Sequence, residues 1–129
     1  MASILKVDTL TGVTTAGSIS VTGEGNSTTT NLQQGLVKFW MQANLSTMSY
    51  DDSFNASSAT DTATGQMTSA FTNNFSNANY SITGASNSGD ANVYNGAQTT
   101  SQWRTYMRSE ANADFDASFA GYMIAGDLA

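Results

Sequence analysis

Apolar and polar residues alternate along several short segments of the chain after residue 34. Successive side chains of a β-strand point to opposite faces of a sheet, so this alternation predicts half-buried strands. The clearest example is residues 35–43. One set of side chains there is expected to face a core: Val37, Phe39, Met41 and Ala43. The other set is expected to face an interface or a half-exposed surface: Leu36, Lys38, Trp40 and Gln42.

Four later segments repeat the pattern, and each predicts a set of side chains on one face of a strand. These sets are Met67, Ser69 and Phe71; Tyr80 and Ile82; Trp103, Thr105 and Met107; and Phe115, Ala117 and Phe119. The third set opposes Arg104, Tyr106 and Arg108, and the last opposes Asp116, Ser118 and Ala120.

Turn-forming residues separate these segments at 60–65, 72–79, 85–92 and 110–114. Proline is absent, so the turns depend on Gly, Asn and Asp. No apolar stripe with helical spacing persists. Short alternating strands with turns roughly every 8–12 residues predict an all-β fold. We expect an antiparallel, jelly-roll-like β-sandwich of about seven strands over residues 35–129.

Residues 1–34 differ from the rest in having little apolar surface. Two short runs, Ile4 to Val7 and Ile19 to Val21, are expected to be strands. Residues 23–35 are polar and glycine-bearing, which predicts a linker or extended arm, with one helical turn as an alternative. Such strands are stable only against other surface. We therefore expect attachment or oligomer contacts at Ile4, Leu5, Val7, Ile19 and Val21, joined by Leu36 and Trp40. The alternative is that the arm lies along its own domain as edge strands.

Composition excludes several classes of site. The 129 residues contain no cysteine and no histidine, which removes disulfides, thiolate metal sites and the commonest general base. Four basic residues against ten acidic ones leave a net charge of −6, which disfavours binding to nucleic acid and to anionic membranes. No apolar run approaches 18 residues, and no basic region precedes an apolar stretch at the N-terminus. We expect neither membrane insertion nor a secretory signal.

Two groups of carboxylates are the candidates for chemistry. Asp51, Asp52 and Asp61 suit calcium by residue type, but they do not fit the 12-residue calcium-loop pattern, which favours a role in turns and solubility. Asp114 and Asp116 would share a face of an extended strand, roughly 6.6 Å apart along it. Glycosidases use carboxyl pairs about 5–5.5 or 6.5–9.5 Å apart. Many chains show this spacing by chance, so we expect no enzyme and no cofactor.

Aromatic residues in the C-terminal half are the candidates for ligand binding. Aromatic faces pack against the apolar C–H groups of sugars. Tyr94, Trp103, Tyr106 and Arg108 could form a sugar-stacking surface. In the alternative interpretation, Trp103 and Met107 belong to the core and Tyr106 to an interface.

Most of the chain resembles small fibre-like, tail-fibre-type virion proteins of marine tailed bacteriophages. The opening "MASILKVDTLTGVTTAGSISVTGEG" is similar to their N-terminal strands. Residues 35–84 resemble the β-domain that ends many such fibres, in which a "KxW" strand precedes "DSFNxSSxTDxxTG" and "FTxxFxNANY". The matching residues are Lys38, Trp40, Asp52 to Asn55, Ser57, Ser58, Asp61, Gly65, Phe71, Thr72 and Asn77 to Tyr80. The likeness is weakest between about 85 and 112.

The resemblance implies a homotrimeric virion structural protein that acts by binding. The arm would attach it to another virion protein of the capsid or tail, and the distal domain would face outward, with a host surface glycan as a further partner. The protein would be made in the host cytoplasm and reside on the virion surface, as a tail fibre, head fibre or capsid decoration. The alternative hypothesis is a stand-alone, lectin-like carbohydrate-binding module.

Overall fold

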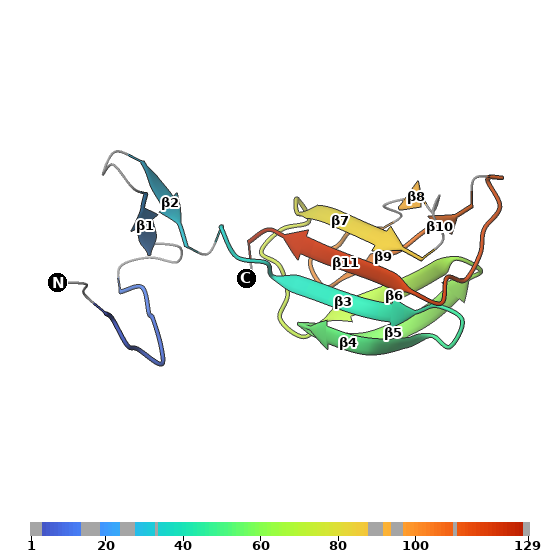
Figure 1. The fold of residues 1–129 in the computed structure, drawn as a ribbon, viewed down its shortest axis with the longest axis horizontal. Coiled ribbons are helices and arrows are strands. Elements are labelled where there is room, and N and C mark those ends of the chain that lie inside the picture. The colour runs from blue at the N-terminus through green and yellow to red at the C-terminus, as the bar shows by residue number, and fades with distance from the viewer. Residues whose placement is uncertain are drawn as a thin grey trace. The chain divides into compact units, whose positions relative to one another are not determined.

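The computed structural model of the chain is all-β (Figure 1). It describes residues 4–13, 19–23, 28–32, 34–87, 92–93, 97–109 and 111–127. Within these residues the chain forms strands β1 to β11 and no helix, so it holds no helix able to span a membrane. The chain divides into two compact units, Met1–Leu36 and Val37–Ala129.

In the described residues of the first unit, the chain forms one short hairpin. Strands β1 (Ser20–Thr22) and β2 (Thr29–Asn31) pair antiparallel, with Val21 opposite Thr30. A further bond from the amide of Leu32 to the carbonyl oxygen of Ile19 (2.8 Å) continues the ladder. The β1 side chains are exposed, so backbone pairing rather than a core holds this hairpin.

Two expectations for the first unit are wrong. The segment from Ile4 to Val7 forms no strand, because no neighbouring strand in the described residues supplies its backbone hydrogen bonds. The predicted linker contains β2, because it returns beside β1. After β2, the amide of Gly35 donates to the carbonyl oxygen of Asn31 (3.2 Å).

Most strands of the second unit lie in two antiparallel sheets. The four-stranded sheet has the order β4 (Ser49–Phe54), β3 (Phe39–Asn44), β11 (Ala120–Ala125) and β7 (Ser81–Ser86). The three-stranded sheet has the order β5 (Ala56–Ala63), β6 (Gln66–Phe71) and β9 (Gln102–Arg104). A two-stranded pair joins β8 (Asn92–Val93) to β10 (Met107–Arg108). The first and last strands of the unit, β3 and β11, are neighbours.

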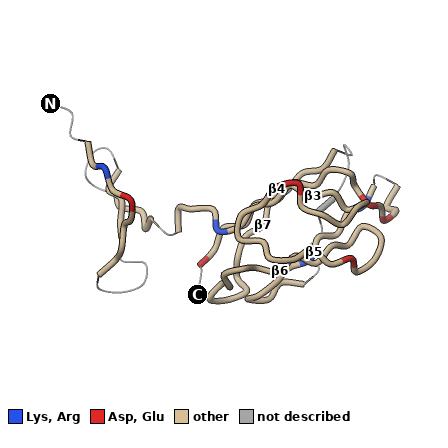
Figure 2. The backbone as a smooth tube through the Cα atoms, turned by 90° about the horizontal axis from the view of Figure 1, so that it is seen from below, with Lys and Arg blue, Asp and Glu red and all other residues tan. Residues whose placement is uncertain are grey.

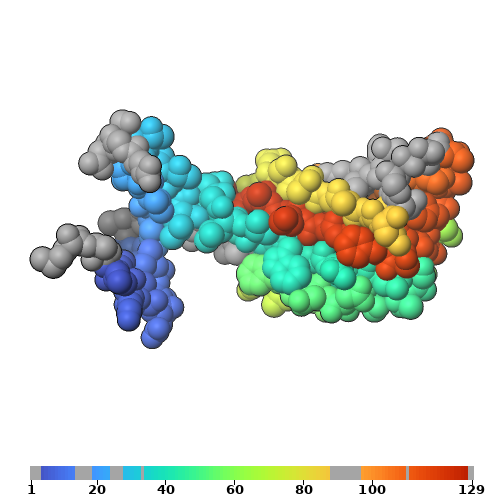
Figure 3. All heavy atoms as spheres, viewed as in Figure 1, coloured from blue at the N-terminus to red at the C-terminus, as the bar shows by residue number. Residues whose placement is uncertain are grey.

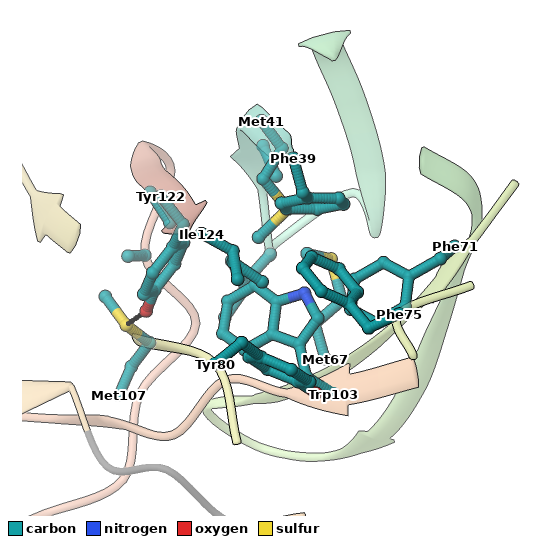
Figure 4. Packing of buried hydrophobic residues seen from close by; sticks show 14 residues of the cluster. Phe39, Met41, Met67, Phe71, Phe75, Tyr80, Trp103, Met107, Tyr122 and Ile124 are labelled. Atoms are coloured by element: carbon teal, nitrogen blue, oxygen red, sulfur yellow. Dashed lines mark hydrogen bonds between the residues drawn. The ribbon is translucent and has the colours of Figure 1, made fainter. Parts of the chain in front are cut away.

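The core lies where the side chains of the two large sheets meet (Figure 4). The ring of Phe39 on β3 makes edge contacts with Phe71 on β6 and Trp103 on β9, at centroid distances of 5.4 and 5.9 Å. Trp103 also contacts Tyr122 on β11 at 4.8 Å. Alternation predicted the orientation of the central residues correctly, because these are all buried: Phe39, Met41, Ala43, Met67, Ser69, Phe71, Trp103, Thr105 and Met107.

Alternation failed at the ends of two predicted strands. Val37 is exposed and Lys38 is buried, because β3 begins only at Phe39 and the preceding backbone does not follow the strand pleat. Near the C-terminus, β11 begins at Ala120, which is buried, whereas Phe119 is partly exposed. The residues before β11 are not a strand, since Asp116 turns aside to accept a hydrogen bond from the amide of Gly65 (2.7 Å).

Asn55 forms the corner at which the chain passes from the four-stranded sheet to the three-stranded one. It lies between β4 and β5 with φ = 63°, a left-handed conformation that Asn tolerates better than most residues. Its side-chain amide donates to the carbonyl oxygens of Lys38 and Asn73, both at 3.0 Å. Its Oδ1 accepts from the amide of Asn73 at 2.7 Å. One side chain thus fixes the corner to two other segments.

Substitutions at Asn55 should separate the cost of the backbone conformation from the cost of these bonds. Asn55→Ala removes the side-chain hydrogen bonds and also places a less tolerant residue in the left-handed conformation. It is expected to lower the free energy of unfolding by about 2–4 kcal/mol. Asn55→Gly keeps the left-handed conformation at little cost and should lose about half as much. Urea denaturation followed by circular dichroism measures both. Equal losses for the two variants would contradict a conformational role for this residue.

Candidate functional site

The outer face of the four-stranded sheet carries the candidate site. Strand pairing places Trp40 of β3 between Phe54 of β4 and Met123 of β11, and Met123 is opposite Thr83 of β7. These four side chains form a row across all four strands, on the side away from the core. In the next row, Gly121 of β11 lies between small or polar neighbours, Gln42 and Ala85.

An open groove of about 450 Å³ lies on this face, and its lining includes Trp40, Gly121 and Met123. Gly121 has no side chain, so the outward surface of β11 is low between Phe119 and Met123. The ring of Phe119 leans over this gap, since a Cβ at Gly121 would lie 3.6 Å from the ring. Trp40 forms another part of the wall. The groove is therefore made by a missing side chain and is held open by paired strands on both sides of β11.

This face is unusually apolar for an exposed sheet. Four large apolar side chains on or beside it are 37–51% exposed, namely Trp40, Phe54, Phe119 and Met123. In the described part of the second unit, Val37 is the other exposed large apolar residue. Figure 3 views the unit from this side. Contiguous exposed apolar surface in a small domain marks a binding or assembly surface.

Charge is sparse here, as it is along most of the backbone (Figure 2). None of the groove-lining residues is charged. Asp52 on β4 lies opposite Gln42, so one exposed carboxylate stands beside the groove. The site can hold an apolar partner, and a cation at its β4 side would be favoured.

The structure locates the expected attachment residues in both units. Trp40 lies on the apolar face of the second unit. Leu36 belongs to the first unit and is 51% exposed. The others also lie in the first unit; Ile4, Leu5, Val7 and Val21 are exposed and Ile19 is half-buried.

The sugar-stacking surface expected in the C-terminal half does not form as a set. Trp103 is fully buried between the sheets, so its predicted place on the surface is wrong and the alternative core placement is correct. The physical reason is that the indole fills the space between Phe39 and Tyr122. Tyr94 lies outside the described residues.

Tyr106 and Arg108 do come together, in a local polar cluster. The guanidinium of Arg108 lies 4.7 Å from the centroid of the Tyr106 ring and donates to the Tyr106 hydroxyl (2.7 Å) and to Asp114 Oδ1 (2.9 Å). These hydrogen bonds, that to Tyr106 foremost, raise the pKa of Arg108. Another bond reaches Asn112, at the turn with φ = 59° (2.9 Å). These hydrogen bonds of Arg108 hold the turn that contains Asn112.

The predicted carboxylate pair is also separated by its partners. Asp114 accepts from Arg108 and from the Tyr106 hydroxyl (3.2 Å), and Asp116 accepts from the amide of Gly65. The two do not share a strand face, because residues 115–117 are not a strand. Asp51 and Asp52 are on β4 and Asp61 on β5. Within the described ranges, no three acidic residues gather as metal ligands would.

Sequence reasoning found Trp40 but missed Phe54, Phe119 and Met123. The period-two pattern of β11 could have placed Gly121 and Met123 together on one face. Nothing in it shows that β11 pairs with β3, and that pairing creates the row.

Comparisons of the chain with protein-family models, with curated proteins and with solved structures found no match.

The contrast between Trp103 and Tyr106 gives a direct test of these placements. Trp103→Ala should lower the free energy of unfolding by about 3–5 kcal/mol, because it leaves a cavity between the sheets. Tyr106→Ala should cost about 1 kcal/mol or less, because Tyr106 is only half-buried and its ion-pair partner Asp114 is exposed. Urea denaturation of the two variants measures the difference. A larger loss for Tyr106→Ala would contradict the core described above.

Proposed function

We propose that the chain is a bacteriophage virion structural protein, a small homotrimeric fibre or surface-decoration unit that acts by attachment and binding. Residues 1–34 are its attachment arm and residues 35–129 its distal domain. The resemblance of residues 1–25 and 35–84 to small fibre-like virion proteins is the basis for proposing a virion protein and a trimer. The distal domain would be a jelly-roll-like β-sandwich, which the aromatic contacts between its two sheets and the pairing of its first and last strands favour.

One observation carries the proposal: large apolar side chains are exposed in both units and concentrate in two places. Five lie within residues 4–13, and these are 50–95% exposed: Ile4, Leu5, Val7, Leu10 and Val13. Four others gather on or beside the outer face of the four-stranded sheet. Burying apolar surface is worth about 25 cal/mol per Å², so association of chains would be strongly favoured.

A carbohydrate-binding module is the second candidate. The groove presents the rings of Trp40 and Phe119 close to the polar side chains of Gln42 and Thr83. A stacking ring beside hydrogen-bonding groups suits a sugar. In the fibre interpretation the same property would serve binding to a host surface glycan. A module that binds sugar as a monomer has no use for the exposed apolar residues at 4–13.

Native mass spectrometry of the full chain tests the oligomer. We expect three chains per particle. Changing Leu5 and Val7 together to Asp should dissociate them, because charges would replace apolar contacts of the arm. Thr9→Asp is the matched control, since it adds a charge to the same arm at a polar position, and it should leave three chains. A wild-type chain that remains single at all concentrations would refute the trimer.

Immunogold electron microscopy of intact particles tests the virion assignment. Antibody raised against residues 35–129 is expected to label the particle surface. Label confined to the tail makes the protein an adhesion fibre, and label over the head makes it a decoration protein. Absence of label from particles that carry the gene would overturn the assignment and favour the carbohydrate-binding module.

A further inference from the structure

We propose that the apolar groove on the outer face of β3, β11 and β7 is the docking site for residues 4–13 of a second copy of the chain. This inference rests on the proposed function, because it requires that chains associate. It assigns a named partner segment to the groove and places the contact between subunits.

The form of the groove favours an inserted segment over a flat partner. The outward surface of β11 is low at Gly121, between Phe119, which precedes the strand, and Met123, which is part of it. A flat sheet laid over this surface would leave the hollow empty, and unfilled space loses packing energy. An extended chain can place aliphatic side chains into it. Because β11 is paired on both sides, the groove needs no rearrangement to receive them.

Residues 4–13 have the properties that such a groove requires. Five of the ten residues are large and apolar, all are at least half exposed, and none lies in a strand. An extended segment of this length spans about 33 Å, whereas a six-residue strand spans about 20 Å. The segment is therefore long enough to cross the whole face. Its large apolar side chains are all aliphatic and therefore narrower than aromatic rings, which suits the gap above Gly121.

Charge points to the same partner. The whole chain carries a net charge of −6, so most of its surface repels another copy. Residues 4–13 are neutral, with Lys6 and Asp8 as their charged residues. The groove lining is uncharged, and Asp52 stands beside it. Lys6, between Leu5 and Val7, supplies the cation that this carboxylate would attract.

The pairing of two different surfaces also fits the proposed number of subunits. Contacts between unlike patches are heterologous, and they generate a ring when the rotation closes. Each copy would offer one arm and one groove, so a closed ring of three copies would leave neither surface exposed.

Disulfide trapping in this cysteine-free chain tests the inference. Variants carrying Met123→Cys with either Leu5→Cys or Val7→Cys are oxidised and resolved by non-reducing electrophoresis. We expect covalent species of two and three chains. Ser81→Cys replaces Met123→Cys in the control, since Ser81 is exposed on β7 but does not line the groove. The control should give at least tenfold less product.

Native mass spectrometry of the same samples distinguishes the possible failures. Product that migrates as a single chain with an internal disulfide would show that each arm fills its own groove, which overturns docking between copies. Three chains without any disulfide product would also overturn the inference but leave the proposed function standing. Single chains throughout would overturn both.

A charge exchange checks the orientation of the arm. Asp52→Lys should lower the rate of disulfide formation about two- to fivefold, as expected for an exposed ion pair. Adding Lys6→Asp to that variant should restore the rate. Circular dichroism confirms that each variant is folded. A rate that falls further in the double variant would refute the contact between Lys6 and Asp52.

Discussion

The edge contacts of Trp103 with Phe39 and Tyr122 join the two sheets of the second unit, and much of the remaining structure depends on them. Figure 4 shows these rings packed together in the core. The indole nitrogen is buried without a hydrogen-bond partner among the described residues, which costs about 1–3 kcal/mol. Burial of the large apolar ring offsets this cost. A smaller residue at position 103 would avoid the unpaired indole N–H, but it would leave space between Phe39 and Tyr122 unfilled.

The same strands that build this core also build the apolar outer face. On β3, Phe39 and Met41 point inward while Trp40 points outward, and on β11 Tyr122 and Ile124 alternate with Met123. Packing of the inward-facing side chains in the core therefore fixes the strands, and the strands fix the positions of the outward-facing side chains. A surface fixed in this way can receive a partner without ordering itself first, which preserves affinity. The core and the proposed assembly surface are two faces of one sheet.

Asn55 and Asp116 show how polar side chains make this arrangement possible in a chain without proline or disulfides. Each is aimed at backbone groups distant in sequence: Asn55 holds the corner between the sheets, and Asp116 holds the turn at Gly65. Asp114 likewise serves its own turn through Arg108. Asp114 and Asp116, the carboxylates considered as a pair in the sequence, thus each bind a separate structural partner.

The sequence by itself determined the β class and the inward-facing residues at the centres of β3, β6 and β9, because side-chain direction in a strand follows from a period of two. It could not determine the ends of strands, as Val37 and Phe119 show, since these depend on partners elsewhere. It also could not place Phe54, Trp40 and Met123 in one row. Only the tertiary structure decided that, because pairing between β4, β3 and β11 brings together residues that are distant in the chain, and no local pattern records which strands become neighbours.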